Sequence, residues 1–167
     1  MKSTVMLGAL FSGVLFVDQV SKYFVDRTLE LNESLPVIEN YFYLRYIRNP
    51  GIAFGLKFGH PFVMLTVTTI IILLLGWLFL KGRLASGNIL EKTAMVLVLG
   101  GAVGNHIDRI RMREVIDFID MGIGRYRWPV YNLADTFVTI GMGILVAAIV
   151  FTDKKPEQTN HAPSSLS

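Results

Sequence analysis

Four apolar segments divide this chain, and acidic residues lie at the ends of three of them. The segments cover residues 5–24, 61–80, 93–110 and 133–151. Asp18 lies late in the first segment, Asp108 closes the third, and Asp135 opens the fourth. A carboxylate in or near hydrocarbon costs free energy, so an acid kept there marks a functional site by default.

The composition and the segment lengths place the chain in a membrane. Hydrophobic residues make up 52% of the chain and charged residues only 17%, which is too apolar for an ordinary soluble domain. Segment 61–80 is uncharged and has the length of one bilayer crossing, about 20 residues. The first segment has no small-residue cleavage site and contains Asp18 and Lys22, so we interpret it as a retained helix rather than a signal peptide. We therefore predict an all-α membrane protein with four transmembrane helices in up-down order.

The stretch between the first two helices, residues 26–59, has a different character. Its part YFYLRYIRN is rich in aromatic residues and mixes hydrophobic with charged residues, which predicts a small β-rich segment on the membrane surface. Asn49, Pro50 and Gly51 follow as a turn. The polar residues 153–167 predict a disordered tail, so we expect one domain over residues 1–152.

Several functional classes are excluded by what the chain lacks. It has no cysteine, which removes thiol nucleophiles and thiolate metal sites. Its net charge is +3 without a basic run, so we expect no nucleic-acid partner. We also expect no metal and no cofactor. An even number of crossings puts both termini on one side, but lysine and arginine occur on both sides and do not fix the orientation.

Helical spacing brings the polar residues together at one end of the predicted bundle. Asp18 and Lys22 are four residues apart and share a helix face, as an ion pair that is expected to be structural. Asn132 and Asp135 share a face in the same way. The motif GGAVGNHIDR places Gly101, Gly104, Asn105 and Asp108 along one face, and we expect Gly100, Gly101 and Gly104 to allow close helix packing.

Two carboxylates that lie close together in a low dielectric share a proton, and such a pair can activate water while it protonates a carbonyl oxygen. The candidates are Asp117, in the short connection between the last two helices, and Asp135, with Asp108 as a rival member. Asn105 and Asn132 are expected to orient carboxylates or substrate, and Arg109 to hold a substrate carbonyl or balance charge. Asp120, in the same VIDFID stretch as Asp117, is explained equally well as a solvated interface charge and as a member of the site.

Five blocks along the chain resemble one family. They are DQVSK (18–22), NPGIAF (49–54), GGAVGNHIDR (100–109), VIDF (115–118) and YNLAD (131–135). Their order and spacing are similar to those of the bacterial lipoprotein signal peptidases, the signal peptidase II family. The resemblance covers residues 10–150. Tyr131 departs from it, because the family more often has Phe there.

The resemblance implies an intramembrane aspartic endopeptidase of the bacterial inner membrane. Such an enzyme removes signal peptides from prolipoproteins by cutting on the amino side of a diacylglyceryl-modified cysteine. The resemblance places the catalytic pair on Asp117 and Asp135 and the active site at the periplasmic face, with both termini in the cytoplasm. Membrane lipids are implied partners, and we expect a monomer. The implied supporting residues are Asp18, Lys22, Asn49, Gly51, Asn105, Asp108, Arg109 and Asn132.

Two other classes of membrane protein compete with a protease. A small proton- or ion-coupled transporter also needs intramembrane acids, but it needs polar residues across the whole membrane depth, and segment 61–80 offers only threonines. A non-enzymatic scaffold does not explain Asp135, whose sequence neighbours are neutral. We therefore favour the protease.

Overall fold

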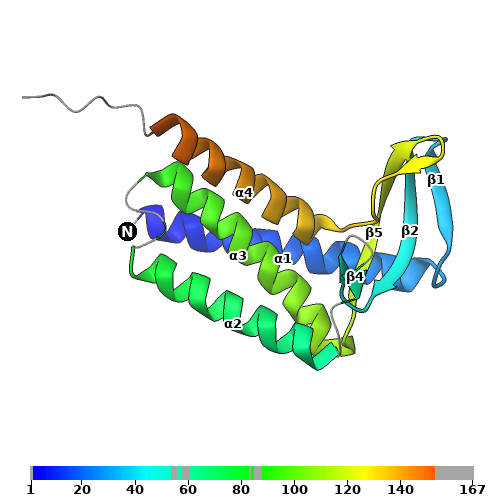
Figure 1. Ribbon diagram of the computed structural model, residues 1–167, viewed down its shortest axis with the longest axis horizontal. Helices are drawn as coiled ribbons and strands as arrows, with labels where there is room; N and C mark the ends of the chain where they lie inside the picture. Colours follow the sequence, from blue (N-terminus) through cyan, green and yellow to red (C-terminus); the bar gives the residue numbers. More distant parts are fainter. Residues whose placement is uncertain (1, 54–55, 58–60, 83, 85–87, 153–167) are drawn as a thin grey trace, which may run out of the picture.

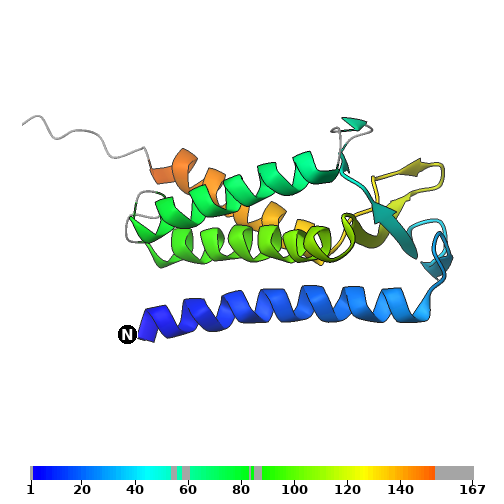
Figure 2. The same ribbon diagram turned by 90° about the horizontal axis from the view of Figure 1, so that it is seen from below.

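The computed structural model describes residues 2–53, 56–57, 61–82, 84 and 88–152. Four helices run side by side, and the strands gather at one end of them (Figure 1). The helices are α1 (Lys2–Thr28), α2 (Pro61–Leu80), α3 (Ile89–Met112) and α4 (Leu133–Thr152). The chain start and the end of α4 lie at the end away from the strands (Figures 1 and 2). The predicted disordered tail, residues 153–167, and part of the surface segment lie outside the described residues.

A four-stranded antiparallel sheet covers the other end of the helices. Its strands are β1 (Ser34–Ile38), β2 (Phe42–Asn49), β5 (Val115–Ile123) and β6 (Tyr126–Arg127), in the order β1-β2-β5-β6. Two short strands, β3 (Ile52–Ala53) and β4 (Leu56–Lys57), form a separate hairpin. The expected β-rich segment after the first helix is therefore present. Two strands of the larger sheet, however, come from the connection between α3 and α4, which we had expected to be only a short connection.

The end of α1 supports this sheet. Val25 and Leu29 are buried against Tyr46 of β2 and Ile116 and Phe118 of β5 in one apolar cluster. The helix runs beyond the expected residue 24, to Thr28, because Val25 and Leu29, which directly follows the helix, extend its apolar face under the strands. Burying a large apolar side chain stabilises a fold by about 1.5–3 kcal/mol. This cluster therefore holds the strands in a fixed position over the helices.

Glycines of α3 allow this helix to pack closely against α1 and α4. A Cβ atom added at Gly101 would lie 2.3 Å from the Ala134 carbonyl oxygen, and one at Gly104 would lie 2.5 Å from Asp18 Oδ2. A Cβ at Gly100 would lie 2.7 Å from Val14 Cγ1 of α1. The expected packing role of these three glycines is confirmed, because no larger residue fits.

Two glycines of α4 allow a matched test of this packing. We expect Gly141→Ala to destabilise the protein by about 1–3 kcal/mol, because the new methyl group must press on the Ala94 carbonyl oxygen, 2.6 Å away. Gly143→Ala is the control, since a Cβ there meets nothing within 4 Å. The control should be neutral or slightly stabilised. Chemical unfolding of both variants in detergent measures the difference, and equal midpoints would contradict the packing role.

The helix surfaces are those of a membrane protein. α1 and the stretch Phe62–Leu80 are each long and apolar enough to cross a bilayer, and the apolar part of α4, Leu133–Ala148, is shorter. None of the most apolar window of α2 is buried inside the protein. Large side chains such as Phe16, Leu73 and Leu80 are exposed. An apolar helix that exposes its apolar side chains requires a hydrocarbon solvent.

The two ends of α3 are capped in different ways. Asn88 is the N-cap, and its side chain accepts a hydrogen bond from the Leu90 amide at 3.0 Å. At the other end Arg113 takes a left-handed conformation with φ 66°, and its amide donates to the Arg109 carbonyl oxygen. This residue ends the helix and turns the chain directly into β5. The turn places Asp117 above the bundle.

Candidate active site

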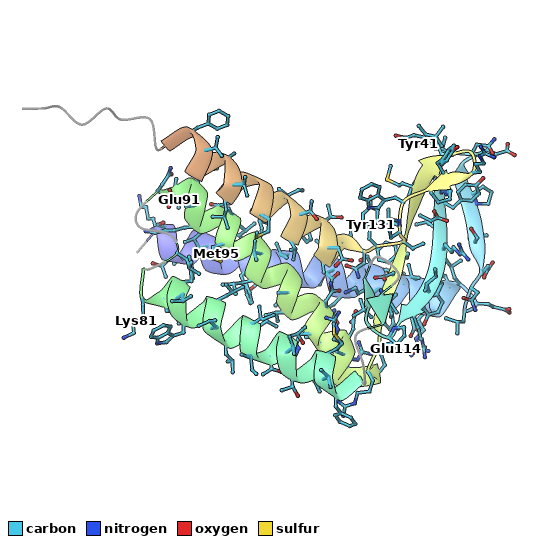
Figure 3. All side chains as sticks on the ribbon, in the orientation of Figure 1. Tyr41, Lys81, Glu91, Met95, Glu114 and Tyr131 are labelled. Carbon is cyan, nitrogen blue, oxygen red and sulfur yellow. The ribbon has the colours of Figure 1, made fainter. Side chains whose placement is uncertain are left out.

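The predicted polar residues meet where the sheet covers the helices. α1 supplies Asp18 and Lys22, β2 supplies Asn49, and β5 supplies Asp117. α3 supplies Asn105, Asp108 and Arg109, and the start of α4 supplies Asn132 and Asp135. The side chains in Figure 3 show the same crowding of polar atoms between the strands and the bundle, close to the labelled Tyr131. The expectation that these residues converge at one end is therefore met.

A buried charge cluster forms the floor of the site. Lys22 Nζ lies 2.9 Å from Asp18 Oδ2 and 2.8 Å from Asp108 Oδ2. It also donates a hydrogen bond of 2.8 Å to Asn105 Oδ1. The side chains of Lys22, Asp18 and Asp108 are 2%, 0% and 1% exposed. A buried ammonium with two carboxylates ties α1 to α3, which agrees with the structural role expected for Asp18 and Lys22.

Asp18 also holds α4. Its Oδ1 atom accepts a hydrogen bond of 3.0 Å from the backbone amide of Ala134 in the first turn of that helix. Gln19, which the sequence reading missed, donates to Asp18 Oδ2, to Asp108 Oδ1 and to the Gly104 carbonyl oxygen. The position of Gln19 next to Asp18 in the DQVSK block was the available signal. Asp18 thus joins α1 directly to α4, and its partners Gln19 and Lys22 extend the link to α3.

Two asparagines link this floor to the other two aspartates. Asn105 Nδ2 donates to Asp135 Oδ1 at 2.7 Å. Asn132 Nδ2 donates to Asp117 Oδ1 at 2.7 Å and to Asn105 Oδ1 at 3.0 Å. Asn132 is fully buried, and its position is fixed from both sides. The expectation that asparagines orient carboxylates therefore matches the contacts.

Asp135 has a structural partner that the sequence reading did not foresee. The Asn132 side chain accepts a hydrogen bond from the Asp135 amide at 3.0 Å, and Asp135 Oδ2 accepts one from the Asn132 amide at 3.2 Å. This reciprocal arrangement is a capping box, with Asn132 as N-cap and Asp135 as the third helical residue. Asp135 thus closes the start of α4 in addition to any chemical role.

Asp117 is the third residue of β5, lies opposite Ile47 of β2, and is 3% exposed. Asn49 Nδ2 donates to Asp117 Oδ2 at 3.0 Å, and Asn49 Oδ1 accepts from the Gly51 amide at 3.0 Å. Gly51 has φ 107°, a conformation that favours glycine, so the turn aims Asn49 at the carboxylate. Burial raises the pKa of Asp117 to about 7, the negative charge of Asp135 adds to the rise, and the amides of Asn49 and Asn132 oppose it.

Arg109 and His106 flank the site without contacting its centre. Arg109 Nη1 donates a long hydrogen bond of 3.5 Å to the Asn105 carbonyl oxygen, and its guanidinium interacts electrostatically with Asp135, Asp117 and Asp108. This agrees with a charge-balancing role. His106 lies 3.1 Å from Thr68 Oγ1 and 3.3 Å from Thr69 Oγ1 of α2, so it joins two helices. No group of residues suited to a metal ion occurs in the described part of the chain.

The interpretation of Asp120 as a solvated charge is wrong. Asp120 is 6% exposed and forms an ion pair of 2.8 Å with Arg127 of β6. Arg127 Nη2 also donates to the Asp120 carbonyl oxygen at 2.7 Å. The sequence reading missed this pair because it did not predict the β5-β6 hairpin that brings Arg127 back. Asp120 therefore braces the sheet.

A cavity of about 730 Å³ opens beside Asp135, between α4 and the β5-β6 hairpin. Aromatic and apolar side chains form most of its wall, and Asp135 borders it. The sequence reading did not predict the cavity, although tyrosines and a tryptophan follow VIDF closely. Its lining residues are Tyr41, Met121, Gly122, Ile123, Tyr126, Arg127, Trp128, Tyr131, Asp135, Thr136, Thr139 and Ile140.

Six aspartates of the described ranges lie at this end of the protein, and they fall into two groups. Asp18 and Asp108 are paired with Lys22, Asp120 with Arg127, and Asp26 with Arg48. Asp117 and Asp135 accept hydrogen bonds from neutral amides, and neither forms a salt bridge with any residue in the described ranges. A pair of carboxylates without bound cations can exchange protons with a substrate and water.

Comparison with known proteins agrees with this arrangement. The model of a family described as signal peptidase (SPase) II matches residues 10–151. A lipoprotein signal peptidase of Syntrophus aciditrophicus (strain SB) is 42% identical over 161 residues, which cover 93% of this chain and 99% of the relative. One of Moorella thermoacetica is 44% identical over 134 residues, which cover 79% of this chain and 84% of the relative.

A solved structure shows the same fold. It is described as a bacterial membrane enzyme and superimposes with a TM-score of 0.80 at 31% sequence identity. The match covers 92% of this chain and 93% of the other. The four helices and the sheet above them are therefore an arrangement already seen by experiment in a similar protein.

Proposed function

The chain belongs to the signal peptidase II family of lipoprotein signal peptidases, and on this premise we propose that Asp117 and Asp135 are its catalytic pair. As a family member it is a membrane-bound aspartic peptidase that processes prolipoproteins. One observation carries the proposal for the residues: among the six described aspartates at this end of the protein, only these two are held by amides instead of cations. Asp108, the rival member, is occupied by Lys22.

The proposed reaction needs one proton acceptor and one proton donor. One aspartate takes a proton from water as the water oxygen attacks the scissile carbonyl, and the other aspartate protonates the carbonyl oxygen. Asn105 and Asn132 hold the two carboxyl groups in a fixed relation, which such a two-proton step requires. The attack proceeds directly from water, without a covalent intermediate on the protein.

We propose that all four helices cross the bacterial inner membrane, with the sheet at the periplasmic face and both termini in the cytoplasm. The lengths of α1 and α2 and the alternating directions of the helices support this arrangement. The lysines and arginines of the loops do not decide which end of the bundle faces the periplasm. We also propose that the enzyme works as a monomer.

We propose that the substrate is a prolipoprotein whose cysteine carries a diacylglyceryl group, and that cleavage occurs on the amino side of that cysteine. The cavity beside Asp135 supports this substrate, because it is mostly apolar and lies where the bundle meets the sheet. Its volume of about 730 Å³ is suited to an organic ligand, for which pockets usually measure about 300–1,000 Å³. Acyl chains bound here would hold the scissile bond near Asp135.

Cleavage by the purified protein tests this substrate. We expect release of the signal peptide from a diacylated prolipoprotein, with the modified cysteine as the new N-terminal residue, and at least about tenfold slower release from the unmodified precursor, since the lost apolar contacts are worth more than 1.4 kcal/mol. Mass spectrometry of both products measures this. Equal rates for the two precursors would contradict the lipid requirement.

A pair of variants tests the cavity itself. Thr139→Trp fills the space next to Asp135 and should raise KM for the diacylated precursor severalfold with little change in kcat. Val146→Trp is the control, because Val146 lies seven residues further along α4, is exposed, and is outside the cavity wall. An unchanged KM for Thr139→Trp would place the acyl chains elsewhere.

A further inference from the structure

The two proposed catalytic aspartates have different surroundings. Asp135 is partly exposed and borders the cavity, whereas Asp117 is 3% exposed and does not contribute to the cavity wall. Water and substrate in the cavity therefore reach Asp135 directly. Asp117 can act only on a substrate atom that reaches past the cavity to its carboxyl group.

The orientation of the Asn105 amide is fixed by Lys22. An ammonium group only donates hydrogen bonds, and Lys22 Nζ donates to Asn105 Oδ1 at 2.8 Å. The Nδ2 group of Asn105 must then face Asp135, to which it donates at 2.7 Å. The buried lysine thus presents a hydrogen-bond donor, and not an acceptor, to Asp135.

Two further features stabilise negative charge on Asp135. Its Oδ2 atom accepts from the Asn132 amide at 3.2 Å in the capping box. It also lies in the first turn of α4, where the helix dipole favours an anion. Both oxygens therefore face donors at the positive end of a helix, and each keeps a lone pair for a water molecule.

Asp117 has no helix dipole beside it, and its burial outweighs the hydrogen bonds that it accepts. It lies in a strand, and the charged groups that face it are Asp135 from α4, Lys22 from α1 and Arg109 from α3. Its hydrogen-bond donors are the neutral amides of Asn49 and Asn132. Burial is the largest influence and raises the pKa of Asp117 to about 7, so at neutral pH a substantial fraction keeps its proton.

We propose that Asp135 begins the reaction as the carboxylate that accepts the proton of the attacking water, and Asp117 as the carboxylic acid that protonates the scissile carbonyl oxygen. This assignment rests on the proposed function, in which these two residues are the catalytic pair. The water oxygen bonds to the carbonyl carbon and gives a neutral gem-diol. Asp135 then passes its proton to the leaving nitrogen, the carbon–nitrogen bond breaks, and Asp117 recovers a proton from a hydroxyl of the gem-diol. Both aspartates end in their starting states.

The Asn49→Ala variant separates the two possible assignments. Asn49 donates to Asp117 and stabilises its ionised form, so the loss of Asn49 raises the pKa of Asp117. If Asp117 is the acid, the productive state persists to higher pH, and the alkaline limb of kcat/KM shifts upward by about one pH unit. The acidic limb should stay in place. It reports the ionisation of Asp135, and Asp117 is protonated both before and after that step. A shift of the acidic limb alone would reverse the assignment.

The control for this profile is Asn88→Ala, which removes the cap of α3 at the opposite end of the bundle. It should leave both limbs in place. A mere loss of folding in Asn49→Ala would lower activity at every pH and would move neither limb.

An infrared measurement covers the case in which Asn49→Ala is inactive. The parent protein, with ¹³C in its aspartate carboxyl groups, is compared with Asp117→Asn and Asp135→Asn about one pH unit below the pKa of Asp117. A protonated carboxyl band that is lost in Asp117→Asn and kept in Asp135→Asn supports the assignment. Loss only in Asp135→Asn, or no such band in the parent protein, overturns it. Undiminished cleavage by either Asn variant would instead refute the proposed catalytic pair, so the two failures are distinguishable.

Discussion

Replacing Asp117 by Asn is expected to lower the rate of prolipoprotein cleavage by at least about 10²–10⁴-fold, the usual contribution of one acid–base group. The amide has nearly the shape of the carboxyl group but cannot exchange the proton that the reaction needs. Asn49 and Asn132 both donate to Asp117, so one of these hydrogen bonds is lost and the fold is weakened only slightly. Signal-peptide release under single-turnover conditions measures the effect.

Asp120→Asn is the matched control for this prediction. Asp120 is also buried and lies in the same strand, three residues further on, but its partner is Arg127. We expect this variant to lose some stability and to keep cleavage within a few fold of the parent protein. If Asp117→Asn retained near-normal turnover, the proposed acid–base role would move to Asp108.

Replacing Lys22 by Met is expected to destabilise the protein by about 3–5 kcal/mol, the cost of removing one partner from a buried ion pair. Lys22 is 2% exposed and supplies the only cation paired to Asp18 and Asp108 in the described part of the chain. Without it, two carboxylates remain buried beside each other. Unfolding in detergent, followed by helix content, measures the loss.

Two further variants serve as controls for Lys22→Met. Lys81→Met removes an exposed lysine at the opposite end of the bundle (Figure 3) and should change stability by less than about 0.5 kcal/mol. The triple variant Asp18→Asn, Lys22→Met, Asp108→Asn removes all three charges and should recover part of the stability. If Lys22→Met alone unfolded like the parent protein, the buried cluster would not be what holds the helices together.

The regular spacing of helical residues made the floor of the site predictable from sequence. Asp18 and Lys22, and Asn105 and Asp108, lie three or four residues apart, so each pair had to share a face of its helix. Alternation of helix direction then had to bring these faces to one end. Packing at Gly101 and Gly104 follows from the same rule, because small residues permit close helix contact.

The parts that were not predicted depend on contacts between distant segments. The β5 strand was not predicted and was taken for part of the connection between α3 and α4. Its sequence VIDFIDMGI is buried on both faces and lacks a simple alternation of apolar and polar residues. Asp120 appeared solvated because nothing local indicates that Arg127 returns beside it. The cavity likewise exists only once the β5-β6 hairpin leans over α4. The double role of Asp135, in contrast, has a local signal, since an asparagine three residues before it is the pattern of a capping box.

The central claim is that Asp117 and Asp135 work as one unit on a prolipoprotein, and a double-variant cycle tests it most directly. Single-turnover cleavage of a diacylated prolipoprotein is measured for Asp117→Asn, Asp135→Asn and the double variant. Because neither residue is useful without the other, the double variant should be about as slow as each single variant. Cleavage at near-parent rate by either single variant, or losses that simply multiply in the double variant, would contradict the claim.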